Sequence, residues 1–303
     1  MKIAIDLQGA QTISRYRGIG RYSVSLAAAI ARNCGRHQIS LALNGAFPES
    51  AFTLRREFQS LIPPEQIRIF QPPLPAAGNH TGNKWRTRAG ELIREYTLAS
   101  LQPDVLVISS LFEGFADDAV TSLDIFVPGA NTAVILYDLI PALKPAEYLG
   151  GTDYREHYFQ KMEHLKKAGL LLAISEATRR EALSFPGLRD LPVRNISAAV
   201  DDRFRPVFLA EDEARELRTS YGIRGRFVLY APGGFDSRKN FRRLIQAWAG
   251  LPQRHRDRYQ LVIVGEMTDE YARRMNRLRS EGGLTERDLI FPGYLPDEDF
   301  VRL

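Results

Sequence analysis

The chain has 303 residues, of which 44% are apolar and 25% charged, the proportions of a folded globular protein with one large or two ordinary domains. No run reaches the roughly 18 uninterrupted apolar residues of a membrane-spanning helix, because Thr132–Leu143 is interrupted by Asp138 and Pro141. Asp6 comes after only three consecutive apolar residues, too early for the core of a secretion signal. We therefore expect a cytoplasmic protein.

Cysteine and histidine usage excludes several kinds of site. The single cysteine, Cys34, cannot form an internal disulfide or a zinc site with two cysteine ligands. None of the five histidines has another three or four residues away, the spacing of a helical two-histidine metal site. The sequence predicts no structural metal.

The positive charge is concentrated near the N-terminus. The chain carries +5 overall, and residues 1–36 contain six basic residues against the single acid Asp6. The basic residues are Lys2, Arg15, Arg17, Arg21, Arg32 and Arg36. Because they surround one glycine-containing loop, they indicate a local anionic partner such as a phosphate rather than nucleic acid. A solvated basic face is the alternative.

Short apolar, β-branched runs alternate along the first two thirds of the chain with segments of helical period, a pattern typical of a parallel sheet covered by helices. We expect strands at Lys2–Leu7, Gln38–Leu43, Ile67–Phe70, Asp104–Ser109, Thr132–Tyr137, Leu170–Ile174 and Val193–Ser197. We expect helices near Ile19–Asn33, Lys84–Leu101, Asp153–Ala168 and Glu176–Phe185.

A second α/β series begins after Pro206, where a polar stretch of the chain ends. Its expected elements, in order, are helix Glu211–Tyr221, strand Phe227–Ala231, helix Asn240–Gly250, strand Gln260–Val264, helix Asp269–Glu281, strand Leu289–Phe291 and a helical start after Pro296. We therefore divide the chain into domains 1–205 and 206–303. Both are Rossmann-like, and the second is incomplete, because doubly wound domains usually have about five or six strands.

Gly18-Ile19-Gly20 follows the first strand and opens a helix. Glycines at a helix N-terminus let backbone N–H groups approach an anion, and Arg15, Arg17 and Arg21 surround this pair. Ordinary turn chemistry is the alternative.

The segment from Gly233 to Asn240 combines Gly233-Gly234 with the basic pair Arg238-Lys239, between a strand and an apolar-periodic helix. Free N–H donors beside two fixed cations suit a diphosphate. A helix with exposed basic residues is the alternative.

Two carboxylates follow expected strands at the edge where open α/β sheets bind ligands. Asp138 comes directly after Thr132–Tyr137, and Glu113 follows Asp104–Ser109 in Ser110-Leu111-Phe112-Glu113-Gly114. Glu113 is suited to accept a hydrogen bond from a sugar hydroxyl. For Asp138, a turn or capping aspartate is the alternative, although Pro141 disfavours an ordinary cap, and a structural role is equally open for Glu113.

Two further segments have mainly structural explanations. Ser175 is expected to cap the helix Glu176–Phe185, with Thr178 one turn further on. The segment Lys84–Leu101 places basic residues beside Trp85 and Tyr96, which suits an anionic membrane surface, although core packing with a solvated face is more common.

Together these segments resemble the retaining glycosyltransferases of the GT-B fold, specifically family 4 and its mannosyltransferase-like members. The resemblance covers nearly the whole chain. It is carried by Ile5-Asp6, Arg17 to Tyr22, Ser110 to Gly114, Tyr137 to Pro141, Ile174 to Ala177, Ala199-Val200-Asp201, Gly233 to Asn240 and Val264-Gly265.

The resemblance implies a nucleotide diphosphate sugar bound between two Rossmann-like domains, an acceptor held mainly by the first, and no metal at the diphosphate. It implies that Arg238 and Lys239 neutralise the leaving diphosphate, with Gly233 and Gly234 beside them. The remaining implied roles are phosphate or acceptor contacts for Gly18 and Gly20, acceptor or sugar contacts for Arg21, Tyr22 and Glu113, and a catalytic role for Asp138.

The sequence departs from the family pattern in two places. Tyr137 stands before Asp138 where family members often carry histidine. The motif of two glutamates separated by seven residues, which holds the donor ribose and sugar, would lie beyond Leu303. A non-catalytic GT-B-like partner or scaffold is therefore the alternative class, and a nucleotide-sugar epimerase is a third, disfavoured by the order of the motifs.

We expect a glycosyltransferase that transfers a hexose, mannose by preference, with retention of configuration. The donor would be a nucleotide diphosphate sugar, GDP-mannose by preference, and the acceptor a growing cell-surface polysaccharide or a lipid-linked glycan. No cofactor and no nucleic acid are expected. The expected location is the cytoplasm, with peripheral contact on the anionic inner face of the plasma membrane.

Overall fold

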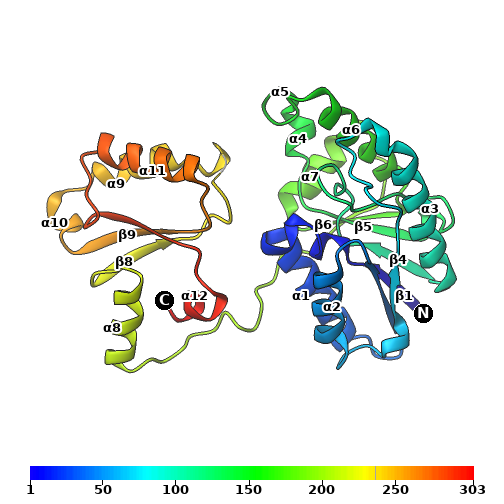
Figure 1. Ribbon diagram of the computed structural model, residues 1–303, viewed down its shortest axis with the longest axis horizontal. Coiled ribbons are helices and arrows are strands. Elements are labelled where there is room, and N and C mark those ends of the chain that lie inside the picture. The colour runs from blue at the N-terminus through cyan, green and yellow to red at the C-terminus, as the bar shows by residue number, and fades with distance from the viewer. Residues whose placement is uncertain (236) are drawn as a thin grey trace. The chain divides into compact units, whose positions relative to one another are not determined.

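The computed structural model describes residues 1–235 and 237–303, which form two compact units, Met1–Ala199 and Val200–Leu303 (Figure 1). Asp236, part of the predicted Gly233 to Asn240 loop, lies outside the described residues. Among the described residues, no helix has the length and apolar character needed to span a membrane.

The first unit is built on a parallel sheet of seven strands in the order β3-β2-β1-β4-β5-β6-β7. The central strand β1 pairs with β2 on one side, where Lys2 lies opposite Gln38, and with β4 on the other, where Ile3 lies opposite Val105. The strands are β1 (Lys2–Asp6), β2 (Gln38–Asn44), β3 (Ile67–Phe70), β4 (Val105–Ile108), β5 (Thr132–Leu136), β6 (Leu170–Ala173) and β7 (Val193–Asn195). All seven predicted strands are confirmed.

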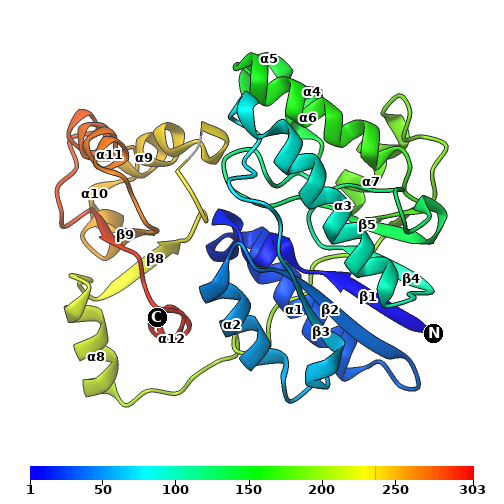
Figure 2. The same cartoon turned by 45° about the vertical axis from the view of Figure 1, so that its right-hand side comes forward.

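Helices cover both faces of this sheet (Figures 1 and 2). On one face, α1 (Gly18–Arg32) and α2 (Pro48–Phe58) enclose an apolar cluster with the sheet. On the other, α3 (Lys84–Ser100), α6 (Thr152–Leu165) and α7 (Glu176–Ser184) enclose a second.

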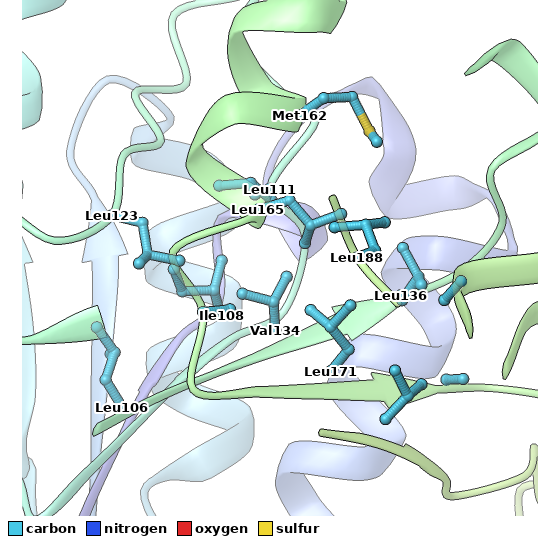
Figure 3. Close-up of a cluster of buried hydrophobic side chains, with 14 of the residues drawn as sticks. Leu106, Ile108, Leu111, Leu123, Val134, Leu136, Met162, Leu165, Leu171 and Leu188 are labelled. Atoms are coloured by element: carbon cyan, nitrogen blue, oxygen red, sulfur yellow. The ribbon is translucent and has the colours of Figure 1, made fainter. Parts of the chain in front are cut away.

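Figure 3 shows this second cluster, in which Val134 and Leu171 of the strands meet Met162 and Leu165 of α6. Strands buried on both faces read as continuous apolar runs, and β5, Thr132–Leu136, is buried along its whole length.

The sequence analysis did not predict α2 or the short helices α4 (Ile140–Leu143) and α5 (Pro145–Tyr148) that follow β5. The first unit also contains 3-10 turns, two of which flank its candidate site. The 3-10 turns of the first unit are Gln8–Ala10, Ile13–Tyr16, Pro64–Gln66, Thr81–Asn83 and Gly129–Asn131.

A cluster of buried charges joins β1, α3 and α6. Arg94 is fully buried and contacts Asp6 Oδ2 through Nε at 2.7 Å and Nη2 at 2.5 Å. Glu95 accepts the Ser122 hydroxyl at 2.8 Å, and Lys161 Nζ lies 3.6 Å from Glu91. Burial lowers the pKa of Lys161 to about 8. Each charge has a partner of opposite sign, which is the condition under which buried ions are tolerated.

The second unit has a parallel sheet of three strands, which confirms the three predicted strands, and their order is β10-β9-β8. The helices α9 and α11 pack on one face around Trp248, Leu261 and Met275. The strands are β8 (Arg226–Tyr230), β9 (Tyr259–Val264) and β10 (Leu289–Gly293). The helices are α8 (Glu211–Ser220), α9 (Phe241–Ala249), α10 (Gln253–Arg256), α11 (Asp269–Glu281) and α12 (Asp297–Arg302).

Candidate functional site

The strand order of the first unit reverses direction between β1 and β4. In an open α/β sheet the loops that leave the carboxyl ends of two such strands diverge and form the usual ligand crevice. Here those loops are residues 7–17 after β1 and residues 109–131 after β4. Glu113 and the glycines Gly18 and Gly20 therefore lie on or next to the two loops expected to bind a ligand.

Glu113 joins these loops through hydrogen bonds. Its Oε2 accepts the hydroxyls of Thr12 at 2.9 Å and Ser14 at 3.4 Å, and its Oε1 accepts the hydroxyl of Ser110 at 2.9 Å. The residue is only 8% exposed, and this burial raises the pKa of its carboxyl. Three of about four acceptor positions on the carboxylate are thus used within the unit, two on Oε2 and one on Oε1.

Asp138 is half-buried, in the turn between β5 and α4. Its Oδ1 accepts a hydrogen bond from the backbone N–H of Ile140 at 3.0 Å, as a turn aspartate does. Leu139 occupies the N-cap position of α4 and makes no side-chain cap. The structure therefore shows that Asp138 stabilises the turn after β5. Its catalytic role stays a prediction.

Tyr137, which replaces the histidine common in the resembling family, packs against α1. Its hydroxyl lies 2.9 Å from Ser23 Oγ and 3.2 Å from the Ile19 carbonyl oxygen. Burial raises the pKa of Tyr137 far above its ordinary value, which keeps the phenol protonated. Its ring meets Tyr22 edge-on, with centroids 5.8 Å apart.

Gly18 and Gly20 differ in why the chain needs glycine. A Cβ on Gly20 would lie 2.4 Å from Arg15 Cα and 2.6 Å from the Ser14 carbonyl oxygen, so Gly20 permits the 3-10 turn Ile13–Tyr16 to pack on α1. A Cβ on Gly18 would meet no atom within 4 Å. Gly18, at the open N-terminus of α1, has the free backbone that an anion could approach.

The two neighbouring residues predicted to contact acceptor or sugar lie on the first turns of α1. Arg21 is exposed. Tyr22 is half-buried, and its hydroxyl donates to the carbonyl oxygen of Ser197 at 2.8 Å. The Tyr22 hydroxyl therefore holds α1 to the segment after β7, a function that sequence analysis did not assign to it.

Sequence analysis missed an aromatic group beside Glu113 that comes mainly from α6. The Phe115 ring lies 4.9 Å from the ring of Tyr154 and 5.5 Å from that of His157. His157 Nε2 lies 3.3 Å from the Glu113 carbonyl oxygen. Burial lowers the pKa of His157 to about 4, so the ring is neutral at pH 7 and Nε2 can donate its proton.

The Tyr154 hydroxyl has a raised pKa. Burial raises the pKa of its hydroxyl, and the negative charges of Glu113 and Asp138 raise it further. The half-buried phenol is therefore neutral at pH 7. The sequence signal for this aromatic group was the spacing of Tyr154, His157 and Tyr158, which places them on one side of a helix. Helix spacing alone does not show which part of the protein that side contacts.

In the second unit, the loop after β8 is shaped by its backbone. Gly233 has φ of +70° and open space around its Cβ position, and Asn240 has φ of +52° at the N-cap of α9. Gly234, the residue after Gly233, is half-buried. Left-handed backbone favours glycine and asparagine, which explains these residue types.

Arg238 and Lys239 lie in the 3-10 turn Ser237–Lys239 at the start of α9. Arg238 is exposed and Lys239 is half-buried. The Tyr230 hydroxyl donates to the Lys239 carbonyl oxygen at 3.4 Å, and Phe235 stacks on Phe241 with centroids 4.9 Å apart. The loop therefore presents two cations at the carboxyl end of β8, supported by aromatic packing beneath.

The predicted Ser175 cap is confirmed, because its side chain accepts the backbone N–H of Thr178. Thr178 in turn donates its hydroxyl to the Tyr137 carbonyl oxygen at 3.0 Å. These contacts support the turn that carries Asp138.

Comparison with known proteins gives similarity in sequence and in overall fold. No family model matches the chain. It is 32% identical over 304 residues to a serotype-specific mannosyltransferase, WbdA, from Escherichia coli, and the match covers 100% of this chain and 36% of that protein. The chain therefore spans about a third of the length of this curated relative.

Solved structures show the fold. HepE from Anabaena, in complex with UDP and glucose, matches with a TM-score of 0.60 and 16% identity, covering 99% of this chain and 71% of that one. WaaG, a glycosyltransferase involved in lipopolysaccharide biosynthesis, matches with a TM-score of 0.59 and 15% identity, covering 98% and 71%. The chain has the two-domain α/β fold of the GT-B glycosyltransferases.

Proposed function

We propose that this chain, a relative of mannosyltransferases with the GT-B fold, transfers a hexose, preferably mannose, from a nucleotide diphosphate sugar with retention of configuration. The acceptor would be a growing cell-surface polysaccharide or a lipid-linked glycan. The carrying observation is the loop after β8, where Gly233 and Gly234 precede the cations Arg238 and Lys239 at the start of α9. Sequence similarity to a mannosyltransferase along the whole chain supports the choice of sugar.

On the donor side, Arg238 and Lys239 would bind the diphosphate. During transfer the anomeric carbon develops oxocarbenium character while negative charge grows on the departing phosphate oxygens. Fixed cations that meet this growing charge lower the barrier, because they stabilise the transition state more than the ground state. Backbone N–H groups of Gly233 and Gly234 would add neutral donors to the same oxygens.

On the acceptor side, Glu113 would hold sugar hydroxyls, with Gly18, Gly20, Arg21 and Tyr22 bordering it, and Asp138 would be a catalytic residue. Glu113 accepts two hydrogen bonds at Oε2 and one at Oε1, and Asp138 uses Oδ1 for Ile140. Carboxylate oxygens make strong, directional hydrogen bonds to hydroxyl donors, which suits a polyhydroxylated acceptor. Phosphate groups of the donor or of a lipid-linked acceptor would meet the N-terminus of α1.

The proposed location is the cytoplasmic side of the plasma membrane, with the protein attached peripherally. This location would bring together a water-soluble donor and an acceptor anchored in lipid.

The test is donor binding and turnover by the native protein that contains this chain. GDP-mannose, UDP-glucose and ADP-glucose are titrated by calorimetry, and transfer to a mannose-terminated oligosaccharide is followed by mass spectrometry. We expect tightest binding of GDP-mannose and an α-linked product. If none of the three donors binds, the catalytic proposal fails and a non-catalytic GT-B-like partner or scaffold is favoured.

A further inference from the structure

Helix α3 carries a row of apolar side chains that do not enter the core. Trp85, Ile93 and Tyr96 have exposed fractions of 63%, 37% and 68%. Their spacing of eight and three residues places them on one side of the helix. Phe126, 51% exposed, extends the row, because its ring lies 6.3 Å from that of Tyr96 in an edge-on contact. We call these four residues the α3 face.

The acidic side chains of α3 are buried, whereas most of its basic side chains reach the surface. Both glutamates of the helix turn inward: Glu91 is 4% exposed and Glu95 is 1% exposed. Glu95 accepts backbone N–H groups of Ile125 and Phe126 at 2.9 and 3.0 Å, which holds Phe126 beside Tyr96. The acidic charge of the helix is therefore removed from its solvent side.

The charges left on the solvent side are positive. Lys84 is exposed, and Arg88 has a side chain that is 56% exposed although it pairs with Glu91 at 3.1 Å. The Arg86 guanidinium lies 4.9 Å from the centre of the Trp85 ring. Aromatic side chains flanked by Lys and Arg are typical of helices that lie in the interface of an anionic bilayer.

We propose that the α3 face docks the first unit on an anionic lipid surface. Exposed aromatic rings flanked by basic side chains favour lipid over a protein partner. Trp and Tyr suit the headgroup level, each basic side chain gains from a negative surface potential, and the helix presents no acidic side chain to solvent.

The α3 face also begins next to the candidate acceptor site. The chain just before α3 packs on the loop of Glu113, since Gly78 N–H donates to the Gly114 carbonyl at 2.9 Å and Asn79 N–H donates to that of Phe115 at 2.8 Å. Asn83, directly before the helix, donates to the Ala77 carbonyl at 3.0 Å. Under the proposed function, on which this step rests, docking would bring the acceptor loop close to lipid-linked glycans.

The experiment measures binding of the protein to vesicles of phosphatidylcholine, with and without phosphatidylglycerol, by sedimentation and tryptophan emission. Trp85 is exposed whereas Trp248, the other tryptophan, is 8% exposed, so a Trp248→Phe background reports on Trp85 alone. We expect a blue shift and at least about tenfold tighter binding to the anionic vesicles, weakening as salt is raised.

Two variants test the surface. Tyr96→Ser with Phe126→Ser removes aromatic contacts, and Lys84→Glu with Arg86→Glu reverses charge; each should weaken binding about tenfold or more while thermal melting is retained. The matched control is Phe52→Ser with Arg55→Glu on α2, where Phe52 is 64% exposed, and it should bind as the parent does.

Activity on a soluble oligosaccharide separates this proposal from the proposed function. The α3 variants should keep that activity, whereas loss of donor binding in the parent would count against the function alone. If neither vesicle shifts the Trp85 emission, or if the α2 control loses as much binding as the α3 variants, the lipid assignment is wrong. A protein partner would then be the favoured occupant of the α3 face.

Discussion

The candidate residues of the first unit and the loop after β8 in the second are held in different ways. Around Glu113, buried side chains hold one another through hydroxyl hydrogen bonds. In the loop after β8, the backbone sets the shape through Gly233 and Asn240, and the cation Arg238 is exposed. The first region therefore couples function to folding stability, whereas the second can change its chemistry at little cost to the fold.

The largest effect is expected in the buried charge cluster of the first unit, which joins β1, α3 and α6. Arg94→Met should leave Asp6 buried without its partner and lower the free energy of unfolding by about 3–5 kcal/mol. Urea denaturation followed by far-ultraviolet circular dichroism measures this loss. Arg88→Met, which breaks a half-exposed pair, is the control and should cost less than about 1 kcal/mol. Equal losses in the two variants would contradict the importance of the buried cluster.

The loop after β8 should show the opposite behaviour. Arg238→Ala should reduce turnover by about 10²–10³-fold, as loss of a charge-stabilising donor does, with the free energy of unfolding changed by less than about 0.5 kcal/mol. Arg242→Ala removes a charge on the next helical turn, where the side chain is 61% exposed and pairs with Glu281 at 3.7 Å. Steady-state rates should be normal in that control. Normal rates in both variants would remove Arg238 from the site.

The two glycines of the first region allow a comparison within one motif. Gly20→Ala should cost about 1–3 kcal/mol, because its Cβ would collide with the backbone of Ser14 and Arg15. Gly18→Ala should change stability by less than about 0.5 kcal/mol, since its Cβ would meet open space. If Gly18 approaches a phosphate of a substrate, Gly18→Ala should raise the KM for that substrate while stability is unchanged. Chemical denaturation and kinetics on the same pair separate packing from binding.

The smallest expected effect is a pH dependence of the first unit. The pKa of His157 is lowered from 6.5 to about 4 in the folded chain, so the unfolded chain binds the proton more readily. The stability contribution is complete above pH 6.5 and is lost as pH falls toward 4. The parent protein should therefore lose stability between pH 7.5 and pH 5. In His157→Gln this loss should be smaller by on the order of 1 kcal/mol, a value reduced to allow for the partial exposure of the ring. An unchanged pH profile would argue against a buried neutral imidazole.

Much of the fold was predictable because parallel strands read as apolar runs. Helix α2 was missed because its sequence is mostly polar and only three of its apolar residues, Ala51, Leu54 and Phe58, reach the core. Glu113 was found from its place after β4. Its hydroxyl donors Thr12 and Ser14 lie about a hundred residues away in sequence, so no local pattern links them to it.

Other site features depend on tertiary contacts that sequence cannot supply. The need for glycine at position 20 arises from a turn packed against α1, and the Tyr22 hydroxyl finds its acceptor 175 residues later, at Ser197. Tyr154 and His157 lie beside Glu113 only because α6 packs there. For Asp138, both a functional and a turn role were open, and the hydrogen bond to Ile140 supports the turn.

The position of β1 at the centre of its sheet also has a consequence for synthesis on the ribosome. One edge of β1 pairs with β2, which follows soon after, but the other edge waits for β4, which begins at Val105. At about 5–20 residues per second, roughly 5–20 s separate the appearance of β1 from that of its second neighbour. During this interval the nascent strand exposes an unpaired edge, so slower translation of the first hundred residues should increase its need for chaperones.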